Sequence, residues 1–156
     1  MSTDSELAPV AAVVVLAAGG GTRMKSSTSK LLHEIAGRPM LSYAVSAAAS
    51  LDPEHLVVVV GHLREQVEEH LAMHQAAVTT AVQEEQLGTG HAVQQTVAHL
   101  PDAGTTLVLN GDVPLIENAT AAALVQACGG ARLALLTVEL ADASGYGRIV
   151  RDGEQV

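Results

Sequence analysis

Runs of consecutive apolar residues, rich in β-branched side chains, recur along the chain. They occupy residues 13–16, 55–61, 78–82, 105–110 and 133–140. Such runs, without the alternation of a half-exposed strand, are typical of strands buried on both faces of a sheet. We therefore predict a β-strand at each of them.

Segments with helical spacing lie between these runs, at residues 40–50, 63–72, 89–100 and 118–128. Pro39 suits the first turn of the first helix, and Gly129-Gly130 would end the last. Residues 30–35 are expected to be irregular or briefly helical. Strands that alternate with helices predict βαβ units and an α/β fold, in which helices cover both faces of a mostly parallel sheet.

The two ends of the chain have different patterns. Residues 1–10 are polar and predict a flexible tail before a single domain over residues 11–156. Residues 147–151 alternate like a strand, Asp152-Gly153 suits a hairpin turn, and residues 154–156 would begin the returning strand. We therefore expect a truncated domain whose sheet is incomplete at the C-terminus.

Composition narrows the class of protein. Phe and Trp are absent and there are two Tyr, so the core must be aliphatic, and no aromatic platform exists for stacking nucleic-acid bases. The net charge of −9 also argues against a nucleic-acid surface. Cys128 is the single cysteine, which suits a reducing cytoplasm. No leader or membrane-spanning run is evident, so we expect a cytoplasmic protein without a membrane partner.

A glycine-rich loop follows the first predicted strand. Gly19, Gly20 and Gly21 let the backbone approach a ligand closely, and Arg23 and Lys30 add positive charge. Unpaired backbone N–H groups in such a loop can hold phosphate oxygens, which indicates a nucleoside-triphosphate site. Glycines that only make a tight turn would explain the loop as well. The loop has neither the Gly-Lys-Ser/Thr of a P-loop nor the third glycine of the dinucleotide fingerprint.

Two further loops follow predicted strands and should reach the same sheet edge. Gln83 can both donate and accept a hydrogen bond, as a uracil edge requires, and Gly88 permits close approach. Thr89 could bind a ligand or simply cap a helix. Asp112 could hold Mg²⁺ together with substrate phosphates, or could be a turn aspartate that bonds its own backbone.

Several motifs together carry a resemblance that extends over most of the chain. They are LAAGGGTRM (16–24), KLLH (30–33), Gln83 with QLGTGHA (86–92), GDVPL (111–115) and GYGRI (145–149). In this order they resemble the nucleotidyltransferases that join sugar 1-phosphates to nucleoside triphosphates. They are most similar to the family of bacterial bifunctional N-acetylglucosamine-1-phosphate uridyltransferase/glucosamine-1-phosphate acetyltransferases.

The resemblance implies a role for individual residues. Arg23 and Lys30 would neutralise the triphosphate in catalysis, Asp112 would bind Mg²⁺, and Gly147 would contact the sugar. The uridine nucleotide would be held by Leu16, Ala17, Ala18, Gly19, Gly20, Gly21, Thr22, Gln83, Gly88 and Thr89. The family usually has proline before the loop lysine, whereas Ser29 stands here, which we expect to loosen the loop.

The resemblance also implies a reaction and an assembly. UTP and N-acetylglucosamine 1-phosphate would give UDP-N-acetylglucosamine and pyrophosphate, for cell-wall precursor synthesis. The complete protein would be a homotrimer, assembled through an acetyltransferase domain that these residues do not contain. Residues 1–156 alone should be nearly inactive. Two alternatives stay open: a related sugar-phosphate or molybdopterin nucleotidyltransferase that uses another nucleotide, and a non-catalytic nucleotide-binding fragment.

Overall fold

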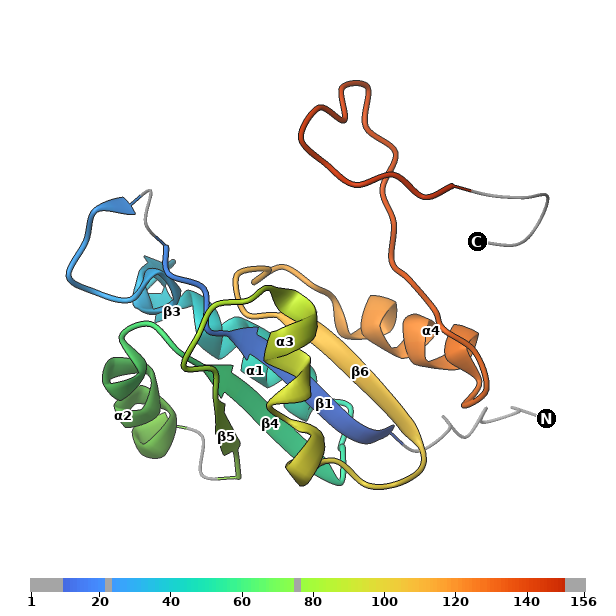
Figure 1. The fold of residues 1–156 in the computed structure, drawn as a ribbon, viewed down its shortest axis with the longest axis horizontal. Coiled ribbons are helices and arrows are strands. Elements are labelled where there is room, and N and C mark those ends of the chain that lie inside the picture. The colour runs from blue at the N-terminus through green and yellow to red at the C-terminus, as the bar shows by residue number, and fades with distance from the viewer. Residues whose placement is uncertain (1–9, 22–23, 75–76, 151–156) are drawn as a thin grey trace.

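A parallel sheet forms the centre of the molecule. The computed structural model describes residues 10–21, 24–74 and 77–150. The sheet contains β1 (Val10–Ala17), β4 (His55–Val60), β5 (Thr79–Val82) and β6 (Thr105–Asn110), in the order β5-β4-β1-β6. Every neighbouring pair is parallel. The predicted α/β fold with a mostly parallel sheet is therefore confirmed (Figure 1).

Helices cover both faces of this sheet. One face carries α1 (Met40–Ala49), α2 (Arg64–His74) and α4 (Asn118–Cys128), which pack against Val13, Val15 and their neighbours. The other face carries α3 (Thr89–Gln94), which packs through Ala92 against Val14 and Val59. Figure 1 shows α3 in front of the sheet and α1 behind it. No helix in the described ranges is long and apolar enough to span a membrane.

Strand β1 owes its position to its apolar residues. Val13, Val14 and Val15 are completely buried, so successive side chains fill the cores on opposite faces of the sheet. Burying one valine side chain contributes on the order of 1.5 kcal/mol or more. A strand whose central side chains are buried on both faces belongs in the interior of the sheet, and β1 lies between β4 and β6.

The helix predicted over residues 89–100 is shorter than expected. Regular α-helix ends at Gln94, and a 3₁₀ turn over Val97–His99 (η3) follows. Thr96 is fully buried, its hydroxyl donates to the carbonyl of Val93, and its own N–H bonds the same carbonyl. These bonds to the third residue back tighten the chain into a 3₁₀ turn, which ends the α-helix.

The segment before α1 is more ordered than expected. A 3₁₀ turn, η2 (Lys30–Leu32), leads into a small antiparallel hairpin of β2 (Glu34–Ile35) and β3 (Arg38–Pro39). Ala36 and Gly37 turn the hairpin with positive φ angles. The hairpin delivers Pro39 to the N-cap of α1, one residue before the predicted position.

The strand predicted over residues 133–140 is wrong, because the segment has no regular structure. An apolar run favours a buried strand, but a strand also needs a partner. The ladder pairs found in the described ranges leave one edge of β6 unpaired. Residues 147–150 likewise form no strand, and the segment extends away from the sheet (Figure 1). The tail at residues 1–9 and the turn at Asp152-Gly153 lie outside the described residues.

A polar contact joins α1 to α2. The Ser42 hydroxyl lies 2.8 Å from Nε2 of His70, whose ring stacks on that of His74 at 4.7 Å between centroids. Burial, and then the proximity of His74, lowers the pKa of His70 below its usual 6.5. The folded chain therefore favours the neutral form of this imidazole.

Truncation of Leu41 tests the larger core. This fully buried side chain of α1 packs against the sheet, so Leu41→Ala should lower the free energy of unfolding by about 2–5 kcal/mol. Leu115→Ala is the matched control, because Leu115 is 82% exposed, and it should change that free energy by less than about 0.5 kcal/mol. Denaturant unfolding of both variants measures the difference, and equal losses would contradict this assignment of the core.

The lowered pKa of His70 predicts a pH dependence of stability. The unfolded chain takes up a proton on this ring more readily, so the free energy of unfolding should fall as pH drops through 6.5. His70→Gln should flatten that fall between about pH 7 and pH 5. Replacing the exposed His99 by Gln is the control and should leave the slope unchanged. If His70→Gln leaves the pH dependence of the free energy of unfolding unchanged, groups other than His70 cause that dependence.

Candidate functional site

A pocket of about 350 Å³ lies where the strands of the sheet end. Residues from the loops after β1, β5 and β6 line it, although these loops are far apart in the sequence. The lining residues are Leu16, Ala18, Gly19, Gly21, Lys30, Leu31, Gln83, Gln86, Gly88, Thr89, Ala92, Asn110 and Asp112. The loops that the sequence singled out thus meet at one edge of the sheet.

The glycine loop packs directly on the stem of Lys30. Gly21 has a φ of +54°, and a Cβ added to it would lie 2.9 Å from Cβ of Lys30. A larger residue would strain the backbone and collide with the lysine stem. On the other side of Lys30, Leu31 is buried in the core and anchors the turn. The position of the Lys30 side chain therefore depends on Gly21 being glycine.

Gln66 of α2 holds the same loop through two hydrogen bonds. The buried Ser29 donates its N–H to Oε1 of Gln66 at 2.9 Å, and Nε2 of Gln66 donates to the Ser27 carbonyl at 2.9 Å. A proline at position 29 would fit the φ of −52° but has no N–H to donate. Contrary to our expectation, Ser29 does not leave the loop loose, because Gln66 ties it to the helix.

Lys30 and Asp112 form an ion pair at the mouth of the pocket. Nζ of Lys30 lies 2.7 Å from Oδ2 of Asp112, and the two side chains are 36% and 44% exposed. The side chains predicted to meet phosphate and metal thus contact each other. The described residues contain no group of three or more histidine, cysteine or acidic side chains that could hold a metal ion. A magnesium ion at Asp112 would therefore take most of its ligands from phosphate and water, as this ion commonly does.

The amide of Gln83 has a fixed orientation. The residue is buried, and its Nε2 donates to the Gly88 carbonyl and to Nδ1 of His91, each at 3.1 Å. Since a carbonyl can only accept, Nε2 must face Gly88, and His91 then accepts at Nδ1. Both amide protons are engaged inside the protein, whereas Oε1 accepts no hydrogen bond from the described residues.

Sequence reasoning missed three side chains at this site. Nε2 of Gln86 donates to the carbonyl of Ala18 at 2.8 Å and so ties the second loop to the end of β1. His91 orients Gln83, and Asn110 lines the pocket from the last position of β6. A polar residue that ends an apolar strand, as Asn110 does, was the only local signal. The partners of Gln86 and His91 appear only in three dimensions.

Some predicted site residues lie elsewhere. Ala17 is buried in the core, and Gly20 belongs to the loop without lining the pocket. Gly147 is exposed in the segment that extends away from the sheet, so the structure does not bring it to the pocket. Thr22 and Arg23 lie outside the described residues.

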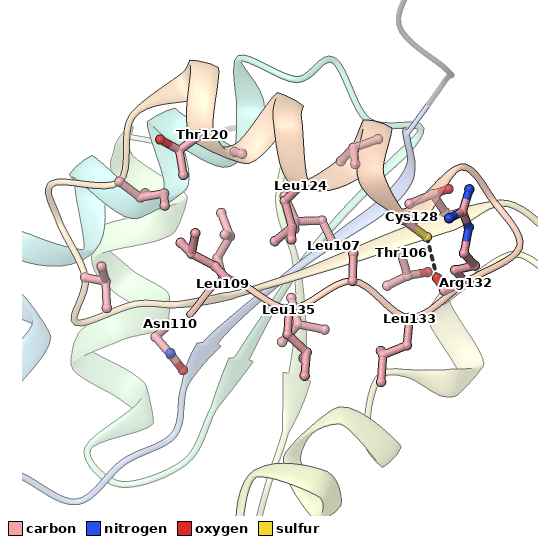
Figure 2. A pocket seen from close by; sticks show the side chains of 18 residues that line it. Thr106, Leu107, Leu109, Asn110, Thr120, Leu124, Cys128, Arg132, Leu133 and Leu135 are labelled. Atoms are coloured by element: carbon pink, nitrogen blue, oxygen red, sulfur yellow. Dashed lines mark hydrogen bonds between the residues drawn. The ribbon is translucent and has the colours of Figure 1, made fainter. Parts of the chain in front are cut away.

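A larger hollow of about 540 Å³ lies between β6, α4 and residues 132–136. Figure 2 shows leucines around it, among them Leu107, Leu124 and Leu135. Arg132 is the charged residue of its lining, and the Arg132 carbonyl accepts a hydrogen bond from the thiol of Cys128. The aliphatic lining offers no candidate chemistry. Because Leu133, Leu135 and Leu136 are exposed, the hollow is an open apolar surface beside β6.

Replacing Gln66 tests how the lysine loop is held. Gln66→Leu should lower the free energy of unfolding by about 1–3 kcal/mol, because it removes two hydrogen bonds and leaves the buried N–H of Ser29 unpaired. The control is Gln126→Leu on the exposed side of α4, with an expected change below about 0.5 kcal/mol. Denaturant unfolding provides the measurement. Similar values for the two variants would rule out an anchoring role of Gln66.

Comparison with curated proteins supports the resemblance inferred from the motifs. The chain is 58% identical over 144 residues to the bifunctional protein GlmU of Methylibium petroleiphilum, which covers 91% of this chain and 31% of that protein. It is also 58% identical over 150 residues to the bifunctional protein GlmU of Cutibacterium acnes, covering 94% of this chain and 36% of that protein. The chain thus spans about a third of the length of these relatives.

Solved structures share the fold at lower sequence identity. Rv0371c from Mycobacterium tuberculosis matches with a TM-score of 0.67 at 23% identity, covering 80% of this chain and 62% of that one. A UDP-glucose pyrophosphorylase complexed with UDP-glucose matches with a TM-score of 0.64 at 18% identity. The match covers 77% of this chain and 53% of that one. Residues 13–144 match the family model of the MobA-like NTP transferase domain. The loops that form the pocket lie within this matched region. The chain therefore belongs to the MobA-like NTP transferase family.

Proposed function

We propose that this chain carries the nucleotide site of an enzyme that makes UDP-N-acetylglucosamine and pyrophosphate from UTP and N-acetylglucosamine 1-phosphate. The main support is a single pocket that unites the glycine loop, Lys30, Gln83 and Asp112. The sequence of the chain is more than half identical to proteins named GlmU over nine tenths of its length. Because the chain spans about a third of those relatives, the activity of the whole protein is part of the proposal.

The reaction is a nucleotidyl transfer. A phosphate oxygen of the sugar 1-phosphate attacks the α-phosphorus of UTP, a new P–O bond forms, and the bond to the β-phosphate oxygen breaks. Pyrophosphate leaves with the electron pair of that bond. The attacking phosphate is already ionised at neutral pH, so no side chain has to remove a proton. Catalysis then consists of holding the reactants in line and neutralising the charge that develops on phosphate oxygens.

The phosphates would lie between the glycine loop and Lys30. Gly19, Gly21 and Lys30 line the same pocket, and Gly21 lies against the lysine stem. The lysine would neutralise charge on the triphosphate and on the leaving pyrophosphate. Arg23 is proposed to act with it on the basis of the motif alone.

The base would be selected by Gln83. Its Oε1 is free to accept the N3–H of uracil, whereas both protons of Nε2 are engaged by Gly88 and His91. Cytosine has no hydrogen at N3, so its ring nitrogen would face Oε1 as a second acceptor. This mismatch leaves a buried polar group unpaired and favours UTP over CTP.

Magnesium is the proposed cation. Asp112 would hold it together with phosphate oxygens and water, and the bound ion would neutralise phosphate charge. The same Mycobacterium tuberculosis protein named above has also been solved as a complex with manganese, with a TM-score of 0.63 at 22% identity. That likeness shows the fold alone, so the proposal rests on the carboxylate beside Lys30 at the pocket mouth.

Several narrower assignments stay predictions. They are a domain over residues 11–156, a contact of Gly147 with the sugar, a homotrimer of the complete protein, a cytoplasmic location, and low activity of residues 1–156 alone. The single cysteine supports the location.

The complete protein should release pyrophosphate from UTP and N-acetylglucosamine 1-phosphate faster than from CTP, by a factor on the order of 10² to 10⁴ in kcat/KM. Lys30→Ala should lower kcat on the order of 10²-fold or more, because it removes charge that stabilises the transition state. A coupled pyrophosphate assay measures both.

Lys25→Ala is the control for charge in the same exposed loop and should retain most of the activity. Wild-type turnover by Lys30→Ala would contradict the role of this lysine. UTP binding that is indifferent to Mg²⁺ and to Asp112→Asn, without pyrophosphate release, would instead identify a non-catalytic nucleotide-binding module.

A further inference from the structure

Lys30 and Asp112 have opposite partners in the proposed reaction but contact each other in the structure. Nζ and Oδ2 are 2.7 Å apart, although the residues are 82 positions apart in the sequence. In the proposed function Lys30 takes phosphate oxygens and Asp112 takes the cation. Each side chain would therefore have to give up the other in order to take its own ligand, and the following inference rests on that proposed function.

Both members of the pair are held by the backbone around them. The lysine stem lies against Gly21, and the preceding residue, Ser29, is tied to Gln66. On the other side, the N–H of Gly111 donates to the Leu16 carbonyl at 2.9 Å, which fixes the start of the Asp112 loop on β1. The contact can thus form and break by side-chain rotation alone.

The strength of the pair suits a contact that must be exchanged. Side chains exposed by 36% and 44% are screened by water, and such pairs shift an equilibrium by no more than about fivefold. The pair is therefore strong enough to compete with a cation held by one carboxylate. It is also weak enough to open when a triphosphate offers Lys30 several anionic oxygens.

We propose that Lys30 is a built-in competitor of the divalent cation at Asp112. While it is paired with Asp112, the ammonium group neutralises the carboxylate and weakens cation binding. When a triphosphate enters, the ammonium group moves to phosphate oxygens, and Asp112 becomes free for the cation, which also gains phosphate ligands. Cation and nucleotide thus enter the site together.

This exchange has a thermodynamic consequence. If the nucleotide raises the affinity for the cation, the cation raises the affinity for the nucleotide by the same factor. Part of that factor comes from releasing Asp112 from Lys30. Removing the lysine charge should therefore tighten cation binding without nucleotide, which is the opposite of the loss expected for a residue that merely helps to form the site.

The test measures Mn²⁺ binding to the full chain without nucleotide, by electron paramagnetic resonance of the free ion. Lys30→Met should bind Mn²⁺ about two- to fivefold more tightly than the wild type. The matched control is Lys25→Met, which removes the same charge from the same exposed loop away from the pair and should change the affinity little. Lys30→Arg retains the charge and should keep the wild-type affinity.

The outcomes separate this inference from the proposed function. Equal Mn²⁺ affinities of Lys30→Met and Lys25→Met would overturn the proposal that Lys30 competes with the cation for Asp112. The absence of detectable Mn²⁺ binding by both variants would overturn it as well. If Asp112→Asn weakens Mn²⁺ binding while Lys30→Met has no effect, Asp112 is a ligand and only the competition fails. If Asp112→Asn leaves the Lys30→Met affinity unchanged, the cation binds elsewhere, and the proposed metal role of Asp112 fails with it.

Discussion

The parallel pairing of β1 with both β4 and β6 positions everything else in this molecule. Residues 12–17 of β1 are in register with residues 55–60 of β4, and Leu16 lies opposite Asn110 of β6. Because the strands run in the same direction, the loops that follow them emerge at one edge. The glycine loop and Asp112 are therefore neighbours because β1 pairs with β6, and Gln83 lies at the same edge because β5 runs parallel to β4.

Small residues and amide side chains then bring the loops to their working distances. Gly21 leaves room for the stem of Lys30, Gln66 holds the preceding turn, and Gln86 ties the second loop to the end of β1. None of these residues would have to touch a ligand to matter. They determine the positions of Lys30 and Gln83. A site that works by positioned charges requires such support from neighbouring groups.

The sequence predicted those parts of the structure that depend on local pattern. The strands around Val13 and the glycine loop follow from runs of adjacent residues, so they are recognisable without a partner. The bond between Ser29 and Gln66 and the pair of Lys30 with Asp112 join distant positions, and no local pattern reports them. The prediction of a strand over residues 133–140 failed for a related reason. Its apolar residues are present, but no strand in the described part of the chain pairs with them.

The open side of β6 bears on how this chain is handled while it is synthesised. Thr106 and Val108 are exposed on a strand whose outer edge pairs with no strand among the described residues, and Leu133 and Leu136 are exposed nearby. During synthesis, residues 10–110 leave the ribosome before the leucine-rich segment does. The unpaired edge of β6 is therefore exposed first, and the exposed leucines follow. Molecular chaperones that bind short aliphatic segments would find a suitable substrate here.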